Sequence, residues 1–392
     1  MNWPTVAISD VAEVVGGATP KSSVEEFWGG EIRWATPKDL SGLGTKYIGD
    51  TPRKITERGL KSCAASVLPS NSVLFSSRAP IGHVAINTEP MATNQGFKSF
   101  VPGPDLDSSF LYWWLDANRA RLQALGTGAT FKEVSKAVVK RIEIPLPPLE
   151  EQKRIAGILD QADALRRLRT RALDKLNTLG QAIFHEMFVR DPDQNWPSVL
   201  IDDIVSNART GPFGSQLLVS EFVDEGIPVL GIDNVVQNKF AWAKERYITP
   251  KKYKDLERYT VLPGDVLITI MGTCGRCAVV PDDIPTAINT KHICCLTLDR
   301  ERVSPEFLQA AFLNHPAILR QLGVQAKGAV MPGLNMGIIK GLSLQLPPMG
   351  LQNKYSELVS SSTKDLERQN CSLEKTEELF SSLQHRAFRG EL

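Results

Sequence analysis

The sequence has no long hydrophobic run. Apolar residues make up 42% of its 392 residues and charged residues 23%, and no apolar stretch approaches the ~20 residues that span a bilayer. These values are typical of a soluble globular protein, so no membrane role is expected. The first residues show no basic segment followed by an apolar run, and we therefore predict no secretory signal and a cytoplasmic location.

The sequence also lacks the motifs that accompany catalysis. No glycine-rich loop ends in Gly-Lys-Ser/Thr, because the run 126–129 has no lysine after it. His185-Glu186 lacks the second histidine of a zinc-protease helix, and no Asn-Pro-Pro-aromatic methyltransferase motif is present. The formal net charge of +1 neither proposes nor excludes nucleic acid, because a basic face can be offset elsewhere. We expect a chain that is not itself an enzyme.

An internal repeat is the most informative feature that is present. Residues 2–6 (NWPTV) return as residues 195–199 (NWPSV), and Val67-Leu68-Pro69 returns as Val261-Leu262-Pro263. Residues 144–188 match 344–388 without a gap. A chain of this length is expected to hold about two domains. The sequence therefore predicts one kind of globular domain that occurs twice, each copy followed by a long segment.

The long segment is predicted to be a helix. Pro147-Pro148 suits a helix start, and Glu150-Glu151 complement the positive end of the helix dipole. Apolar residues then recur at steps of three and four, as expected for one face of a helix: Ile155, Leu159, Ala162, Leu165, Leu168, Ala172, Leu176, Leu179, Ile183 and Met187. Two such helices related by a pseudo-two-fold axis are expected to pair as an antiparallel coiled coil.

The predicted fold class is thus α/β (α+β) globular domains in tandem repeat, each followed by a long helix. We expect the first domain at 1–145, the first helix at 146–190, the second domain at 191–345 and the second helix at 346–392. Short strands are expected at 72–76 and 261–270, and helical segments at 110–125 and 305–322.

Six cysteines without a secretory signal argue against a disulfide framework and leave buried thiols or a metal site. The second half groups residues that superficially resemble a zinc ribbon: Cys274, Cys277, His292, Cys294 and Cys295. Cys274 and Cys277, however, occupy the places of Ile81 and Val84 in the repeat, and adjacent residues of a strand point to opposite faces. We favour small buried side chains and predict no metal.

Basic residues cluster at corresponding places of the two domains, which favours a surface that follows DNA phosphates over a merely solvated loop. The clusters are Lys38, Lys46, Arg53, Lys54, Arg58 and Lys61, and Lys239, Lys244, Arg246, Lys251, Lys252, Lys254 and Arg258. Glycine-containing turns at 16–21 and 209–216 lie beside charge in both halves and can approach a phosphate through backbone N–H groups. An ordinary surface turn is the alternative.

The residues 144–155 (IPLPPLEEQKRI) resemble the opening of the spacer helix in specificity subunits of type I restriction-modification systems. Residues 34–40 resemble that family's early strand and loop, and residues 82–86 with 94–96, and 275–279 with 289–291, resemble a pair of motifs late in each recognition domain. The resemblance covers the whole chain. It departs at His83, where arginine is usual, at Thr290-Lys291, which replaces Gln-Gly, and at residues 349–351, which lack the paired glutamates.

The resemblance implies that each domain reads one half of an interrupted double-stranded DNA site. It further implies two modification subunits that methylate adenine with S-adenosylmethionine, and restriction subunits that use ATP and Mg²⁺; this chain itself would bind no cofactor. Predicted DNA contacts are Thr19, Lys21, Thr36, Lys38, Arg53, Lys54, Arg78, Gln95, Ser215, Gln216, Asn234, Lys251, Lys252, Arg276, Lys291 and Lys327.

The helices are predicted to bind the modification subunits through side chains that include an exposed Phe184 and Phe188. The full set is Gln152, Ile155, Phe184, Phe188, Gln352, Tyr355 and Phe388. Two alternatives from other classes stay open: a helical scaffold for proteins alone, and a zinc enzyme built on the second half.

Overall fold

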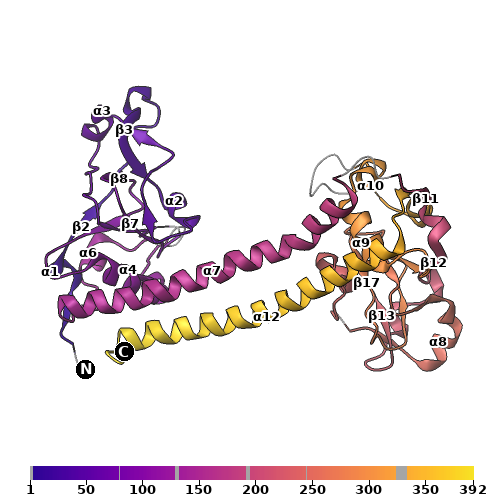
Figure 1. Ribbon diagram of the computed structural model, residues 1–392. Coiled ribbons are helices and arrows are strands. Elements are labelled where there is room, and N and C mark those ends of the chain that lie inside the picture. Colours follow the sequence, from indigo (N-terminus) through magenta and orange to yellow (C-terminus); the bar gives the residue numbers. More distant parts are fainter. Residues whose placement is uncertain (1–2, 79, 129–131, 191–194, 244, 324–332) are drawn as a thin grey trace. The chain divides into compact units, whose positions relative to one another are not determined.

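The computed structural model describes residues 3–78, 80–128, 132–190, 195–243, 245–323 and 333–392. The chain divides into two compact units (Figure 1). The first unit contains residues 1–171 and 371–392, and the second contains residues 172–370. Each boundary falls inside a long helix, so each unit combines one globular domain with segments of both long helices.

The first unit is built on a five-stranded and a three-stranded sheet. Their strand orders are β2-β9-β6-β7-β4 and β5-β3-β8, and a further two-stranded sheet joins β1 to β10. β3 and β8 run parallel, whereas β2 and β9 run antiparallel. The strands are β1 Thr5–Ala7, β2 Ala12–Gly16, β3 Trp28–Ala35, β4 Tyr47–Ile48, β5 Lys54–Ile55, β6 Val73–Phe75, β7 Val84–Asn87, β8 Met91–Thr93, β9 Lys98–Pro102 and β10 Glu143–Pro145.

Both faces of the five-stranded sheet are covered. One face packs with α4 and the start of α7 in a core that includes Phe75, Phe110 and Leu159, and the other packs with Leu40 and Met91. In Figure 1, α4 lies between this sheet and α7. The shorter helices are α1 Ile8–Val11, η1 Glu25–Phe27, α2 Pro37–Ser41, α3 Glu57–Lys61, α4 Ser108–Ala117, α5 Arg119–Ala124 and α6 Lys136–Lys140.

The second unit repeats this plan. Its sheets have the orders β12-β19-β16-β17, β14-β13-β18-β15 and β11-β20. The parallel pair of β13 with β18 corresponds to that of β3 with β8. Its strands are β11 Ser198–Leu200, β12 Val205–Thr210, β13 Ile227–Leu230, β14 Tyr247–Ile248, β15 Thr260–Val261, β16 Val266–Thr269, β17 Cys277–Val279, β18 Ala287–Asn289, β19 Ile293–Leu298 and β20 Ser343–Gln345.

The second unit contains nine shorter helices among its described residues. They are η2 Ile201–Ile204, η3 Gly214–Gln216, η4 Val219–Glu221, η5 Ile232–Asn238, α8 Pro250–Leu256, η6 Glu257–Tyr259, α9 Pro305–Asn314, α10 Pro316–Gln321 and α11 Met336–Lys340. The expected strand 261–270 is two strands, because Pro263 and Gly264, the latter with φ +72°, turn the chain between β15 and β16. The expected helical segments 110–125 and 305–322 are two helices each.

The two long helices are α7, Leu149–Phe188, and α12, Met349–Ala387, each directly after the paired prolines, as the sequence predicts. In the first unit, Arg169 of α7 donates to the Ser372 hydroxyl of α12 at 2.7 Å, and Arg154 donates to the carbonyl of Leu392. Arg154, near the start of α7, therefore meets the chain just after α12, whereas Arg169, further along α7, meets an earlier residue, within α12. In the second unit, Phe184 of α7 packs on Tyr355 of α12 with ring centroids 5.8 Å apart.

The predicted apolar stripe of α7 is correct at its start and wrong further along. Ile155 and Leu159 are fully buried, but Leu165 and Leu168 are 48% and 59% exposed. In this stretch the buried side chain is Asp163, which pairs with Arg166 at 2.6 Å and also with Arg167. No described helix is long and apolar enough to cross a membrane.

Candidate nucleic-acid interface

A groove of about 540 Å³ in the first unit brings together four of the predicted DNA contacts. Its lining residues are Thr36, Pro37, Lys38, Ser41, Arg78, Pro80, Asn94, Gln95 and Gly96. They come from the start of α2, the chain after β6 and the turn between β8 and β9. Hydroxyl, amide, ammonium and guanidinium groups that converge in an open groove are suited to base edges and phosphates.

The glycine turn at residues 16–21 is held against this groove. A Cβ on Gly17 would lie 2.0 Å from the carbonyl oxygen of Asn94, so only glycine allows the approach. The next residue donates its N–H to the carbonyl of Thr93 at 2.9 Å. One residue further on, the Thr19 hydroxyl donates to the side-chain oxygen of Gln95. Thr19 thereby joins the four predicted contacts that line the groove.

An aromatic pair lies beneath the surface next to this turn. Trp28 and Trp34 meet edge to face with ring centroids 5.0 Å apart, and the Trp34 indole donates to the carbonyl of Ala18. The guanidinium of Arg53 lies 3.8 Å from the Trp28 ring centroid. Stacking holds this exposed cation in place, as suits a phosphate contact. The composition of the region did not reveal the role of Trp28, because the stacking depends on the antiparallel pairing of β3 with β5.

The remaining predicted contacts of the first unit differ in whether the side chain forms an ion pair within the domain. Lys21 and Lys38 are exposed, whereas Lys54 forms an ion pair with Asp50 at 3.4 Å. Hydrogen bonding to the Thr51 backbone and the neighbouring cations lower the pKa of the Asp50 carboxyl, so it stays ionised at neutral pH. Lys54 is thus partly neutralised by its partner.

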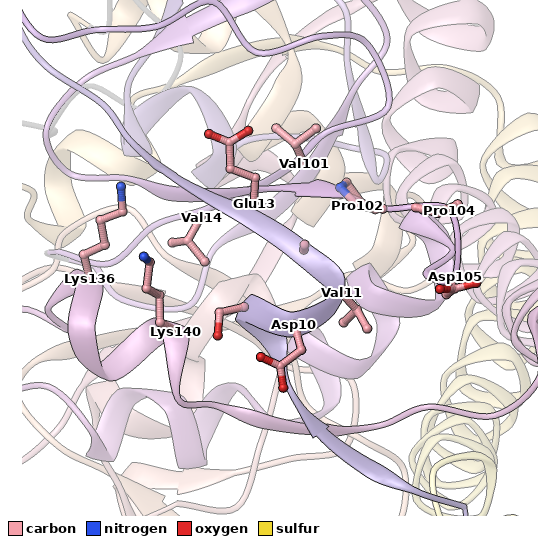
Figure 2. A pocket seen from close by; sticks show the side chains of 13 residues that line it. Asp10, Val11, Glu13, Val14, Val101, Pro102, Pro104, Asp105, Lys136 and Lys140 are labelled. Atoms are coloured by element: carbon pink, nitrogen blue, oxygen red, sulfur yellow. The ribbon is translucent and has the colours of Figure 1, made fainter.

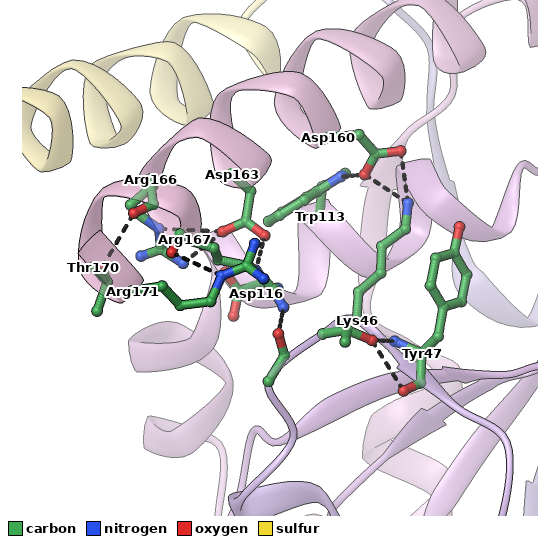
Figure 3. Close-up of polar contacts among 12 residues, drawn as sticks. Lys46, Tyr47, Trp113, Asp116, Asp160, Asp163, Arg166, Arg167, Thr170 and Arg171 are labelled. Carbon is green, nitrogen blue, oxygen red and sulfur yellow. Dashed lines mark hydrogen bonds and ion pairs between the residues drawn. The ribbon is translucent and has the colours of Figure 1, made fainter. Parts of the chain in front are cut away.

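Lys46, which the sequence placed in the basic cluster, is buried and does not belong to this surface. Its ammonium donates to Asp160 of α7 at 2.6 Å, and the Trp113 indole donates to the same carboxylate (Figure 3). The ammonium also donates to the Ser109 hydroxyl at 2.9 Å. A buried ammonium must be paired, and the helix supplies the partner. Lys46 therefore anchors the domain to its helix.

In the second unit, hydrogen bonds fix which residues correspond to the groove. Asn94 and Thr290 donate their N–H to the carbonyls of Ala35 and Leu230, respectively. Gly211 repeats the close approach of Gly17, since a Cβ on it would lie 2.0 Å from the carbonyl oxygen of Asn289. The corresponding pairs are Thr19 and Phe213, Thr36 and Gly231, Pro37 and Ile232, Lys38 and Asp233, Asp39 and Asn234, Arg78 and Met271, Gln95 and Lys291, and His83 and Arg276. This corrects the alignment made from the sequence, which placed Gln95 opposite Thr290, because strand pairing shifts the match by one residue.

Asn234 is not free to reach a base edge, which corrects the expectation from the sequence. Its side chain is 3% exposed; its oxygen accepts from the N–H of Gly231 at 2.9 Å and its amide donates to the carbonyl of Ala241 at 3.0 Å. It corresponds to Asp39, whose carboxylate accepts from the N–H of Thr36. Both side chains cap a turn, so their polarity serves the local backbone.

The other predicted contacts of the second unit are dispersed. Ser215, Lys251 and Arg276 are exposed, and Lys291 is half-buried. Two more are occupied within the unit: Gln216 accepts from the Tyr259 hydroxyl at 2.9 Å, and Lys252 pairs with Glu221 at 2.7 Å. Lys327 lies outside the described residues, as does Lys244 of the basic cluster.

The cysteines of the second unit lie in its cores. Cys277 and Cys294 belong to one buried cluster and Cys295 to another, which confirms that the two adjacent residues face opposite sides of β19. Burial raises the pKa of the Cys294 thiol to about 12, and burial also raises that of Cys277. These thiols stay protonated and pack as small apolar groups.

The predicted partner-binding residues of the helices are mostly buried inside their own unit. Phe184 and Phe188 are 0% and 3% exposed and pack on Phe307 of α9, so the expected exposure is wrong. Ile155 and Tyr355 are also buried, and Phe388 is half-buried against Phe110. Their place on a helix did not show that the unit's own domain covers that part of the helix.

Gln152 and Gln352 are buried for a structural reason. Gln152 accepts from the N–H of Asp107, the N-cap of α4, and donates to two backbone carbonyls at 2.8 and 2.9 Å. Gln352 accepts from the N–H of Ser304, the N-cap of α9, and likewise donates to two carbonyls. The repeated glutamine therefore ties each long helix to its domain and is not available to a partner.

A second hollow, of about 670 Å³, lies at the opposite ends of β2 and β9 from the groove. Figure 2 shows Lys136 and Lys140 on α6, with Glu13 and Asp10 among the other lining residues. None of the predicted DNA contacts lines it. The groove beside Gln95 is thus the better candidate for the recognition surface.

Comparison with known proteins gives one consistent result. The model of the family described as type I restriction modification DNA specificity domain matches residues 1–178 and 194–374. The MjaIX type I restriction enzyme specificity subunit of Methanocaldococcus jannaschii is 28% identical over 378 residues, 91% of this chain and 86% of that one. The EcoBI specificity subunit of Escherichia coli is 24% identical over 335 residues, 78% of this chain and 70% of that one.

Solved structures show the same fold. A chain of a type I R-M system, from a study of its assembly and conformational transition, has a TM-score of 0.65 at 17% identity, covering 100% of this chain and 98% of that one. The type I restriction-modification S subunit from M. genitalium has a TM-score of 0.57 at 16% identity, covering 99% and 96%.

Proposed function

Because this chain belongs to the family of type I restriction-modification DNA specificity domains, we propose that it is a reader of double-stranded DNA in which each of its two domains recognises one half of an interrupted site. The observation that carries the proposal is the groove that Thr36, Lys38, Arg78 and Gln95 line in the first domain. Arginine and lysine can donate to guanine, and glutamine can pair with adenine, in the major groove.

Division into two half-sites is supported by the repeat itself. Both units share four strands of the central sheet in the same order, β2-β9-β6-β7 and β12-β19-β16-β17, and hold a glycine turn against the chain at the end of β8 or β18. The side chains around this turn nevertheless differ at most corresponding positions, for example Lys38 and Asp233. Two backbones of one kind with different side chains are suited to two different base sequences.

The long helices are proposed to pair as an antiparallel coiled coil with pseudo-two-fold symmetry and to carry the modification subunits. Contacts within each unit support this: Arg169 with Ser372 in the first and Phe184 with Tyr355 in the second. The docking surface proposed for the modification subunits moves to the exposed leucines of α7 and α12, since the phenylalanines are buried. These leucines are Leu165, Leu168, Leu179, Leu351, Leu358 and Leu379.

Catalysis is assigned to the partners. Modification subunits would methylate adenine with S-adenosylmethionine, and restriction subunits, where present, would use ATP and Mg²⁺. Within the described ranges no three His, Cys, Asp or Glu side chains gather closely enough to hold a metal ion. This chain would recognise the target sequence in the DNA and position the methyltransferase on it.

Domain exchange tests the proposal. Residues 1–145 are replaced by those of a relative, and the sites methylated by the assembled complex are mapped in a host genome. We expect one half-site to change and the other to remain. A change in both half-sites would contradict separate reading, and a chain that never co-purifies with a methyltransferase would contradict the assembly. Lys251→Ala should weaken binding to all sequences and lower its salt dependence, because we propose that this exposed lysine contacts a phosphate.

A further inference from the structure

At two positions the recognition surface of the second unit carries an apolar side chain where the first unit carries a polar one, and at a third a branched aliphatic side chain replaces a proline. Phe213, Ile232 and Met271 stand at the positions of Thr19, Pro37 and Arg78. They are 49%, 36% and 40% exposed. Single exposed apolar side chains are common on protein surfaces and need no explanation. Three of them at positions that correspond to one groove indicate a binding surface.

The corresponding residues of the first unit, Thr19, Pro37 and Arg78, line or adjoin one groove, so we assign these three side chains to one surface. A Cβ on Gly272 would lie 3.3 Å from the Cδ1 atom of Ile232, so Ile232 lies against the residue that follows Met271. Phe213 follows the turn that Gly211 places against Asn289. Trp242, 56% exposed, is brought to the same region because Asn234 bonds the carbonyl of the preceding residue. We call Phe213, Ile232, Met271 and Trp242 the apolar cluster.

The loop that carries Phe213 is held by polar contacts. The backbone N–H of Phe213 donates to the side-chain oxygen of Gln216, which also accepts from the Tyr259 hydroxyl at 2.9 Å. The ring of Phe213 is therefore exposed to solvent on a segment that hydrogen bonds hold in place. Exposure of Phe213 is a property of the fold and not of an unsupported loop.

Cations border the apolar cluster. Arg276 is exposed at the position of His83, and Lys291 stands at that of Gln95. Burial and the neighbouring charges of Lys291 and Arg246 lower the pKa of His292, so this ring is neutral at pH 7. Lysine and arginine around an apolar centre are suited to phosphates around a base edge without charge.

We propose that the second domain reads thymine through its C5-methyl group, using Phe213, Ile232 and Met271, whereas the first domain reads its half-site through hydrogen-bond donors. Of the four bases, thymine alone presents a methyl group in the major groove, and apolar side chains recognise it by contact. The inference rests on the proposed DNA-reading function and adds the base chemistry of each half-site.

The test uses the complex of the full chain with its modification subunits and a duplex that carries its own site, found by methylation mapping. Thymines of each half-site are replaced one at a time by deoxyuridine, which lacks only the methyl group. We expect weaker binding, about fourfold per contacted methyl, in the half-site read by the second domain. Replacement in the other half-site should change binding less than twofold, as an order-of-magnitude expectation.

Variants assign the effect to the cluster. Phe213→Ala and Met271→Ala should each reduce the difference between thymine and deoxyuridine. The matched control is Leu262→Ala, which is 47% exposed but precedes β16, whereas Met271 follows it. Met271→Arg, which restores the residue of the first domain, should lower the dependence on thymine.

Several results would overturn the inference while leaving DNA reading intact. They are a second half-site without thymine outside the methylated pair, equal binding of deoxyuridine duplexes, or cluster variants that lose the modification subunits but keep thymine discrimination. The last would make the cluster a protein contact. If the complex binds its mapped duplex no better than a scrambled one, the proposed function itself fails.

Discussion

The two domains have the same backbone fold in the central sheet but carry different side chains at two corresponding positions of that sheet. In the second domain, Arg209 of β12 and Asp265 before β16 form an ion pair, with side chains 7% and 1% exposed. Thr297 completes the group by donating to Asp265 at 2.7 Å. The first domain has Val15 and Ser72 at the positions of the ion pair, and Val15 packs in a hydrophobic core.

This difference shows that the fold does not depend on one solution at that place. An apolar side chain in one domain and a buried ion pair in the other support the same strand order, β2-β9-β6-β7 or β12-β19-β16-β17. The ion pair carries the greater risk, because each charge has lost its water and relies on the other. The two solutions can therefore be told apart by removing one member.

The largest expected effect is that of Asp265→Asn. The guanidinium of Arg209 would stay buried without a counter-charge, and we expect the second unit to lose about 3–5 kcal/mol. Hydrogen exchange of β12, β16 and β19 in the full chain, followed by mass spectrometry, measures this. The double change Arg209→Val with Asp265→Ser, which copies the first domain, should recover most of the loss. A double variant no more stable than Asp265→Asn would show that the surroundings require the charges.

The next effect should be equal in the two units. Gln152→Leu and Gln352→Leu each leave one N–H and two carbonyls without their partner, which should cost about 2–4 kcal/mol in the unit concerned. Hydrogen exchange near the N-termini of α4 and α9 reports each loss. Lys153→Ala, an exposed change on the same turn, should alter stability by less than about 0.5 kcal/mol. Clearly unequal losses would contradict the equivalence of the two junctions.

The third effect should be confined to the first unit. Lys46→Met removes the partner of Asp160, but this carboxylate is 38% exposed and regains water, so we expect about 1–3 kcal/mol. Exchange of α7 near residue 160 should rise while that of the second unit stays unchanged. Lys54→Met, at an exposed pair, is the control. A loss as large as that of Asp265→Asn would mean that Asp160 remains desolvated.

The smallest effect concerns pH. His315 lies between α9 and α10, where the first domain has Asn118, and its Nδ1 accepts from the N–H of Ala317. Burial, with a smaller contribution from Arg320, lowers its pKa below the unfolded value of about 6.5. The unfolded chain then binds more protons, so stability is present above about pH 6.5 and is lost as pH falls below it. His315→Asn should remove this part of the pH dependence of the second unit, seen by comparing exchange at pH 7 and pH 5; an unchanged dependence would assign it to other groups.

Much of the architecture could be predicted from the sequence because it rests on local and repetitive signals. The prolines before Leu149 and Met349 mark helix starts, and the repeat of residues 144–188 at 344–388 requires the same structure twice. The groove could also be anticipated in part. Gln95 and the glycine turn at 16–21 were separate motifs, and the structure brings them together through the close approach at Gly17.

The sequence by itself determined the repeat, the two long helices and the kind of side chain at each turn. Only the tertiary structure decided which polar residues are available. Lys46, Asn234 and Gln152 are residue types that often bind DNA or a partner. In this chain Lys46 and Gln152 bond groups that are distant along the sequence, and Asn234 caps a local turn. The physical reason is that burial obliges a polar group to find a partner inside the protein, and periodicity does not show which face of a helix or turn will be covered.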